Sequence, residues 1–331
     1  MLSNHTSDPI ESQLREEALY KPYQSLNAYL KKKYGEKIYK IALDGGFTCP
    51  NRDGTCGTRG CIFCSAGGSG EFATAIRQNS SIDAQITQAL ARFGNKQTGQ
   101  RFIAYFQAYT GTYAAPERLY ALYHMALSHP KIIGISIATR PDCLPAPVLD
   151  VIKQCQMEFP DKFVWIELGL QSVHEKTALY IRRGYPLSCF EGALETLQTM
   201  SVPVIVHVIL GLPGETRADM LATIDYLSHK NIFGIKLQLL HVLRGTDLAA
   251  EYERGVFSCL SKEAYIDLLC SCIDHLNPAI VLHRVTGDGP KDLLIAPTWS
   301  LQKRDVLNSL HKALRDGEHF QGKDFGNHRP L

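Results

Sequence analysis

The sequence predicts an α/β protein built as a partial (βα)6 TIM-like barrel with parallel strands. Between residues 38 and 285, short apolar runs rich in β-branched and aromatic residues alternate with longer segments of helical period. This alternation is typical of parallel strands joined by crossover helices. With 331 residues and 45% hydrophobic content, the chain can bury one large core. Six strand–helix units are fewer than the eight of a complete barrel.

The predicted elements follow in order along the chain. Strands are expected over residues 38–43, 101–107, 132–138, 163–168, 204–210 and 234–240, and a seventh apolar run, 279–285, is expected at the edge of the sheet. Helices are expected over residues 82–93, 116–128, 145–157, 190–200, 217–230, 262–276 and 301–315. Pro116 and Pro145 fit the first turns of two helices, where the missing N–H of proline has no partner to lose.

Two flanking segments frame this core, which spans residues 38–285. Residues 1–37 are polar and charged and are interpreted as an N-terminal extension with a short helix. Residues 286–331 are interpreted as a C-terminal segment that covers the barrel. Its last part, from residue 319, is rich in Gly, His and basic residues and is expected to be a loosely ordered tail.

Composition narrows the class of protein. The formal net charge is only +2, so any basic surface for a nucleic acid must be local. No signal-like segment and no run of about 18 apolar residues is present, which favours a cytoplasmic protein without a membrane partner. The ten cysteines are therefore interpreted as reduced thiols, some of them metal ligands.

Polar residues follow four consecutive predicted strands. They are Gln107, then Thr139, Arg140 and Asp142, then Glu167 and Gln171, and then the turn at residues 211–215. In parallel βα architectures, ligands bind where the loops at the carboxyl ends of the strands converge. The sequence therefore predicts one shared pocket at this end.

The loop after the first strand holds four thiols within sixteen residues, Cys49, Cys56, Cys61 and Cys64. Closely spaced thiolates are the usual ligands of iron–sulfur clusters, and the glycines of the loop allow it to fold tightly. The spacing favours Cys49, Cys61 and Cys64 as three ligands of a cluster with one open iron. A structural zinc site that uses all four thiols is the alternative.

This loop resembles that of radical S-adenosylmethionine (SAM) enzymes, although eleven residues separate its first two ligands where three are usual. Five segments resemble the YhcC/YtqA-like branch, which is related to the radical SAM core of the Elongator catalytic subunit. They are GFTCPNRDGT (46–55), YFQAYT (105–110), ATRPDC (138–143), ELGLQS (167–172) and TGDGPKDLLIAP (286–297). The resemblance implies two cofactors, a [4Fe-4S] cluster and SAM, and reductive cleavage of SAM to a 5'-deoxyadenosyl radical.

The resemblance also implies SAM contacts for seven residues. They are Phe63, Gln107, Arg140, Glu167, Gln171, Arg183 and Gly211. Several of them have an ordinary structural interpretation beside this one. Phe63 fits a core position, Arg140 an ion pair with Asp142, Arg183 a solvated basic turn, and Gly211 a turn without a ligand.

Other polar residues receive a structural interpretation first. His207 and His241 lie near strand ends, where core histidines are common but contact with substrate is open. Cys270 and Cys272 are two residues apart in a predicted helix, so they point to different faces and favour buried thiols over a second cluster. Core positions are also expected for Cys143, Cys155 and Cys189.

The Elongator-like resemblance suggests tRNA as the substrate, with reaction at the side chain of a wobble uridine. Basic residues for phosphate contacts are expected at Lys31–Lys33, Arg182–Arg183, Lys303–Arg304, Lys312, Arg315, Lys323 and Arg329. The reaction also needs an external electron donor of the flavodoxin or ferredoxin type. Alternatives are a radical reaction on a small metabolite and a non-catalytic, zinc-stabilised RNA-binding module.

Overall fold

Seven parallel strands form one curved sheet in the computed structural model, which describes residues 22–68, 70, 81–93, 99–287 and 289–326. The strands lie in the order β1-β2-β3-β4-β5-β6-β8, so neighbours in the sheet follow the order of the chain. They are β1 (Tyr39–Leu43), β2 (Phe102–Phe106), β3 (Ile132–Thr139), β4 (Phe163–Gln171), β5 (Val204–Leu210), β6 (Gly234–Leu239) and β8 (Val281–Arg284). The sheet curls into a half-barrel whose edge strands, β1 and β8, do not pair with each other.

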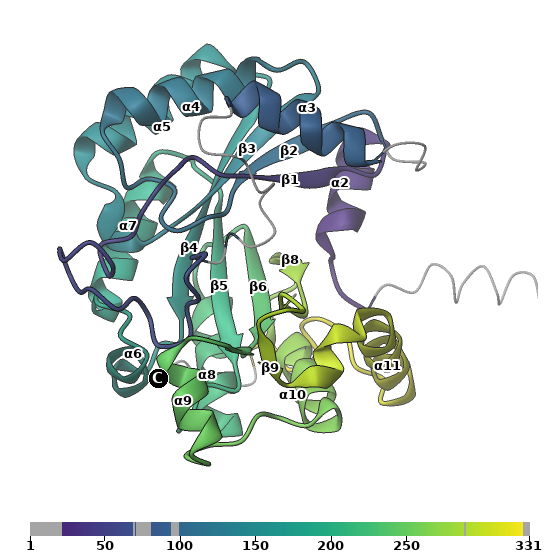
Figure 1. Cartoon of the computed structure of the whole chain (residues 1–331). Coiled ribbons are helices and arrows are strands. Elements are labelled where there is room, and N and C mark those ends of the chain that lie inside the picture. Colours follow the sequence, from purple (N-terminus) through teal and green to yellow (C-terminus); the bar gives the residue numbers. More distant parts are fainter. Residues whose placement is uncertain (1–21, 69, 71–80, 94–98, 288, 327–331) are drawn as a thin grey trace, which may run out of the picture.

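Helices cover the outer face of this sheet (Figure 1). Along the chain they are α3 (Ile82–Phe93), α4 (Pro116–Ser128), α5 (Ala146–Glu158), α7 (Leu187–Thr199), α8 (Arg217–Ser228) and α10 (Lys262–His275). Outward side chains of the strands pack against them in one large core that includes Phe106, Ile137 and Val206. Strands covered on both faces read as continuous apolar runs, and all five residues of β2 are buried.

The amino ends of the strands are closed by α2 (Leu26–Tyr34). Its Leu30 is 1% exposed and packs in a separate cluster with Ile38, Ile103, Trp165 and Ile205 from the inside of the half-barrel. The N–H of Leu282 in β8 also bonds the carbonyl of Gln24 at 2.8 Å. This end of the half-barrel is therefore filled by apolar side chains.

Smaller elements cover the opposite end of the strands. The short strands β7 (Val242–Leu243) and β9 (Leu294–Ala296) pair antiparallel. The other small elements are α6 (Glu175–Tyr180), α9 (Asp247–Glu253) and two 3-10 turns, η1 (Pro141–Cys143) and η2 (Thr298–Leu301). The longer helix α11 (Lys303–Asp316) packs instead against α10.

The predicted fold class is confirmed, and so is the edge position of the seventh strand. Four local predictions were wrong. Pro145 is the N-cap of α5 and Pro147 lies in its first turn, α7 begins at Leu187 rather than at Phe190, and β4 continues to Gln171 rather than ending at Leu168. The thiol of Cys189 is partly exposed, whereas those of Cys143 and Cys155 are buried.

The start of the expected loose tail is also ordered. Gln321 donates to the carbonyls of Asn277 and Ile280 at 2.8 and 2.7 Å, and the N–H of Asp324 bonds the carbonyl of Asp274. The rest of that tail, residues 327–331, lies outside the described residues. The division into segments 1–37, 38–285 and 286–331 stays a prediction. Within the described part of the chain, no helix combines the length and apolar character that a membrane span needs.

The closure of the half-barrel by α2 can be tested with Leu30→Ala. Truncating this buried side chain should lower the free energy of unfolding by about 2–5 kcal/mol, measured by urea denaturation. As a control, Leu301→Ala removes a leucine that is 40% exposed and should change it by less than about 0.5 kcal/mol. Equal, small effects would contradict a closing role for α2.

Candidate active site

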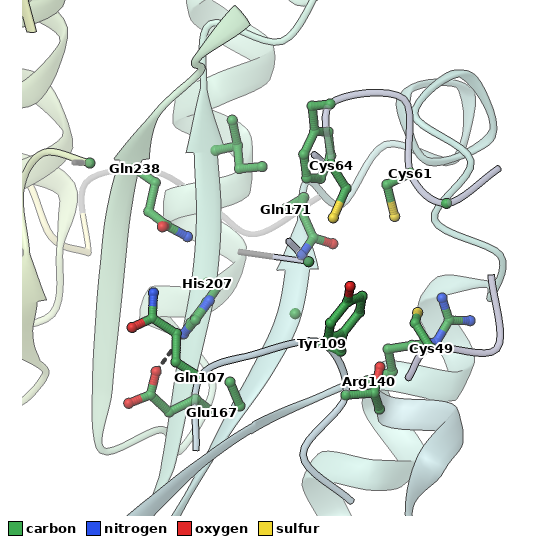
Figure 2. A pocket seen from close by; sticks show the side chains of 18 of the residues that line it. Cys49, Cys61, Cys64, Gln107, Tyr109, Arg140, Glu167, Gln171, His207 and Gln238 are labelled. Atoms are coloured by element: carbon green, nitrogen blue, oxygen red, sulfur yellow. Dashed lines mark hydrogen bonds and ion pairs between the residues drawn. The ribbon is translucent and has the colours of Figure 1, made fainter. Parts of the chain in front are cut away.

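A cavity of about 250 Å³ lies at the carboxyl ends of the strands, where the predicted pocket was expected. Figure 2 shows the sulfur atoms of Cys49, Cys61 and Cys64 on one side of it and Gln107, Glu167 and His207 on the other. Six of the seven predicted SAM contacts line it, namely Phe63, Gln107, Arg140, Glu167, Gln171 and Arg183. Gly211 is not among the described lining residues, and its N–H donates to the sulfur of Met220 at 3.1 Å.

The cysteine loop, residues 44–68 after β1, folds back on itself through backbone hydrogen bonds. The N–H of Cys56 bonds the carbonyl of Pro50 at 2.8 Å, and that of Gly60 bonds the carbonyl of Asn51 at 2.7 Å. Gly60 has a φ of 73°, and a Cβ there would lie 3.1 Å from the guanidinium of Arg52. The long gap between the first two cysteines is therefore a compact loop that brings Cys61 back beside Cys49.

Two polar side chains of the loop hold it in place. Arg52 donates to the carbonyls of Cys64 and Ser65 at 2.9 and 2.5 Å. Asn51, which is 4% exposed, donates to the carbonyl of Arg182 at 2.7 Å and lies 3.5 Å from the sulfur of Cys61. Neither residue was singled out in the sequence. Their position within the cysteine loop was the only available signal.

The donor set fits an iron–sulfur cluster. Cys49, Cys61 and Cys64 all line the cavity, whereas the side chain of Cys56 is exposed and does not. Among the described residues, no group of three or more Cys, His, Asp or Glu side chains lies close enough to hold a single metal ion. A cluster suits a wider arrangement, because each thiolate binds a different iron. Burial raises the pKa of Cys61 to about 12, so its thiolate needs a cationic partner such as iron.

Arg140 and Arg183 join the strand ends to the cysteine loop. Arg140 forms the ion pair with Asp142 that was the alternative interpretation, with nitrogen–oxygen distances of 2.9 and 2.6 Å, and it also lines the cavity. Arg183 is only 1% exposed and donates to the carbonyls of Leu170, Ser172 and Tyr185. The interpretation of Arg183 as part of a solvated turn was therefore wrong.

The turn around Arg183 packs against the cysteine loop. Gly184 has a φ of 84°, and a Cβ there would lie 2.7 Å from the side-chain oxygen of Asn51. Gln171 ends β4 with a φ of 65° at an irregular point of the strand register, and its amide points into the cavity in Figure 2. A non-glycine residue in this region of φ is uncommon and is typical of binding sites.

Glu167 lies at the centre of a polar layer that crosses the inside of the half-barrel. It is fully buried and accepts hydrogen bonds from Ser136 at 2.5 Å and from the Nε2–H of His207 at 2.6 Å. Its carboxylate also pairs with Lys40, at 2.6 Å, and with Lys236. Seven strands contribute one side chain each to this layer: Lys40, Tyr105, Ser136, Glu167, His207, Lys236 and Arg284.

Burial and the neighbouring charges shift the pKa values of the ionisable groups in this layer. Burial alone would raise the pKa of Glu167, but Lys236 and Lys40 hold it well below its ordinary value. Burial lowers the pKa of Lys236 to about 7 despite the attraction of Glu167. Burial and the charge of Lys236 lower the pKa of His207 to about 4, so this imidazole stays neutral and donates to Glu167. The predicted SAM contact by Glu167 stays a prediction, as does a contact between His207 and substrate.

A second cavity, of about 330 Å³, adjoins the first at Tyr105, Gln107, Lys236 and Arg284. It is also lined by Lys40 of β1 and His283 of β8, so it lies at the open side of the half-barrel between the two edge strands. The two cavities together have a size usual for small-molecule sites. The half-barrel therefore offers two adjoining cavities, one at its open side and one beside the three thiols.

The remaining predictions concern histidines, cysteines and the segment after β8. His207 and His241 both line the first cavity, while Cys270 and Cys272 are 2% and 0% exposed within α10, which confirms them as core thiols. Gly287 and Pro290 line the same cavity, so the segment that was expected to cover the barrel does border its pocket.

Comparison with known proteins agrees with this geometry. A sequence model of the radical SAM superfamily matches residues 54–227, and one of the radical SAM C-terminal domain matches residues 232–316. The first match begins after Cys49, where the long gap departs from the usual spacing. The chain is 41% identical to the protein YtqA of Bacillus subtilis over 92% of its own length and 93% of that protein.

More distant relatives share part of the chain or only the fold. Elongator complex protein 3 of Danio rerio is 27% identical over 50% of this chain and 30% of its own length. The structure of Elp3 from the archaeon Methanocaldococcus infernus superposes with a TM-score of 0.63 at 14% identity, over 85% of this chain and 63% of that one. The structural likeness supports the half-barrel fold.

The three-thiol assignment predicts a difference between neighbouring cysteines. After anaerobic reconstitution with iron and sulfide, Cys49→Ala, Cys61→Ala and Cys64→Ala should each lose most of the bound iron, because each removes one ligand of the cluster. Cys56→Ala should bind as much iron as the parent. Iron loss in Cys56→Ala equal to that in Cys61→Ala would contradict the assignment and favour a four-thiol site.

The buried imidazole predicts a pH dependence of stability. His207 has a folded-state pKa of about 4, below its ordinary value of 6.5, so the unfolded chain binds a proton between these values and the folded chain does not. Stability should therefore fall as the pH is lowered from 6.5 to 5.0. In His207→Gln, urea denaturation should show a shallower fall, with proton uptake on unfolding reduced by up to about one proton. Equal slopes would contradict the buried, neutral state of His207.

Proposed function

This chain belongs to the radical SAM superfamily, and we propose that it uses the chemistry of that superfamily to modify tRNA at the side chain of a wobble uridine. The observation that supports a reaction site best is the convergence of Cys49, Cys61 and Cys64 on the cavity that the ends of the strands line. The kinship with Elongator complex protein 3 supports tRNA as the substrate.

The three thiolates would hold a [4Fe-4S] cluster, which with bound SAM supplies a 5'-deoxyadenosyl radical able to abstract hydrogen from an unreactive carbon. The protein's own share is to bind, orient and shield. Arg140 and Gln171 present a guanidinium and an amide to the cavity, suited to the carboxylate and hydroxyl groups of SAM. The cleavage consumes an electron, for which we propose an external donor of the flavodoxin or ferredoxin type.

The half-barrel suits a single nucleotide better than a duplex. Its two cavities have the size of a small-molecule site, so the reacting nucleoside would have to leave its stack and enter from the open side. Near that side, α2 carries the exposed Lys31, Lys32 and Lys33 (Figure 1). The exposed Lys312 and Arg315 of α11 lie on the neighbouring helix, since Tyr23 contacts His311 at 3.3 Å.

Some of the basic residues that were expected to contact tRNA phosphates are not part of this proposal. Arg182 pairs with Asp247 at 2.7 Å, Arg183 is buried, and Lys323 donates to the carbonyl of Glu318 at 3.1 Å. Arg329 lies outside the described residues. The proposed phosphate contacts are therefore those of α2 and α11.

Cleavage of SAM in the presence of tRNA tests this function. The reconstituted, dithionite-reduced protein should form 5'-deoxyadenosine, measured by chromatography, and bulk tRNA that lacks the modification should increase the amount. The Cys61→Ala variant should form none. Cleavage that tRNA leaves unchanged would contradict the tRNA role and favour a small metabolite, whereas bound zinc without cleavage would favour an RNA-binding module.

The basic helix α2 predicts a salt-dependent contribution to tRNA binding. The triple variant Lys31→Ala, Lys32→Ala, Lys33→Ala should bind tRNA more weakly, and its affinity should depend less steeply on salt, because fewer phosphates are neutralised. A filter-binding assay over a range of salt concentrations measures both effects. Lys153→Ala removes an exposed charge from α5 and should match the parent. Parent-like binding by the triple variant would exclude α2 from the interface.

A further inference from the structure

The polar layer at the floor of the cavity holds more ammonium groups than carboxylates. Lys40 and Lys236 both pair with Glu167, so two positive charges share one negative charge. Among the described residues that line the two cavities, Glu167 is the only aspartate or glutamate. Buried charges are costly unless each has a partner of opposite sign. As far as the described residues go, the layer is thus short of negative charge at the place where the two cavities meet.

Lys236 is the best placed of the two ammonium groups to contact a ligand. Its side chain is 4% exposed, and it lines both cavities, whereas Lys40 lines only the one at the open side. It donates to the hydroxyl of Tyr105 at 3.0 Å and to Glu167. An ammonium has three N–H groups. Two of them thus have acceptors within the described protein, and the third is available to a further acceptor in the cavity.

A side-chain amide lies one level above this ammonium, toward the carboxyl ends of the strands. Gln238 follows Lys236 by two residues on β6, so both side chains point to the inside of the sheet, and both line the cavity. In Figure 2 the amide of Gln238 faces Gln107 and His207 across the cavity, away from the three sulfur atoms. An ammonium with neighbouring amide donors is a suitable site for the oxygen atoms of an anion.

We propose that the polar layer binds an anionic oxygen group of the substrate, a carboxylate or a phosphate, with Lys236 as its charged partner and Gln238 as a neighbouring donor. The inference rests on the proposed function, because it takes this cavity to be the place where the substrate lies. An anion here would give the two lysines a second negative charge. It would also hold the rest of the substrate between this floor and the thiol side of the cavity.

A purely structural layer would explain these observations less well. One lysine is enough to neutralise Glu167, and a second buried ammonium has to share the attraction of the same carboxylate, which offsets less of its desolvation cost. The lowered pKa of Lys236, about 7, is what burial beside too little negative charge produces.

Small anions test the proposal on the reconstituted protein without reductant, both in the absence of SAM and with SAM at saturation. Thermal unfolding is followed while sodium acetate or inorganic phosphate is added, with sodium chloride keeping the ionic strength constant. As one of the two anions is added, the melting temperature should rise and then level off as the site fills. The reason is that a ligand that binds only the folded state stabilises it. A response to acetate identifies a carboxylate site, and a response to phosphate identifies a phosphate site.

Variants show whether the response belongs to this layer. Lys236→Met should weaken the apparent affinity for the anion by about tenfold or more, as expected for loss of a charge-assisted hydrogen bond. Gln238→Leu leaves the ion pairs intact and should weaken the apparent affinity for the anion to a smaller extent. This variant replaces Lys236→Met in the test if Lys236→Met does not fold. Lys153→Met, on the outer helix α5, should respond like the parent.

Three results would overturn the proposal. They are a parent that responds to neither anion beyond chloride, variants at Lys236 and Gln238 that respond like the parent, and a response that disappears when SAM is present. The last result would assign the site to the carboxylate of SAM. Since SAM cleavage and tRNA do not enter this assay, a failure here with intact tRNA-stimulated cleavage counts against the anion site alone.

Discussion

Glu167 carries a negative charge in the middle of the half-barrel, and four side chains from four other strands contact it. Lys40, Ser136, His207 and Lys236 each reach it from β1, β3, β5 and β6. A slip of one residue in any of these strands would turn its polar side chain to the outer, apolar face. Removal of the carboxylate would leave two ammonium groups buried without a partner, at a cost of several kcal/mol.

The polar layer around Glu167 divides the interior of the half-barrel into three levels: the layer itself, the part below it and the part above it. Below the polar layer, Ile103, Trp165 and Ile205 pack against α2 and close the half-barrel. Above it lies the cavity that the cysteine loop borders. The layer thus keeps apolar side chains from filling the centre of the half-barrel, and a hollow remains between β1, β8 and the three thiols.

Hydrogen bonds within the cysteine loop and to the neighbouring turn hold the loop in place beside the cavity. Arg52 and Asn51 replace the short spacing between ligands that is usual in the superfamily, because they fix a longer segment in a compact shape. Their partners include the turn at Arg182, which follows β4 and α6. The cysteine loop and the half-barrel therefore position each other. The thiols face the strand ends even though the first two cysteines are far apart in the sequence.

The sequence was sufficient for the strands and for the residues at their ends. Buried parallel strands are apolar runs between helical segments, and polar residues directly after them necessarily share one end of the sheet. Six of the seven residues predicted as SAM contacts accordingly line one cavity, while their roles toward SAM stay predictions. Gly211 is not among the described residues that line the cavity, and its N–H bonds the sulfur of Met220, a contact between elements that spacing does not reveal.

The polar layer was the main feature that the sequence analysis missed. Lys40 and Lys236 lie within strands that are otherwise apolar, and this was the available signal, since a central parallel strand has no solvent face for a charge. The two lysines meet at one carboxylate because of the register of the strands and the curvature of the sheet, and neither can be predicted from the apolar runs. The short helices α6 and α9 were missed because six or seven residues show too little periodicity.

We propose that three thiols hold a cluster whose remaining iron is open to SAM at the end of this half-barrel. Electron paramagnetic resonance of the reconstituted, dithionite-reduced protein tests this proposal. A [4Fe-4S] signal whose g values change when SAM is added is expected in the Cys56→Ala variant as well as in the parent. A signal that SAM leaves unchanged, or bound zinc in place of a cluster, would contradict it.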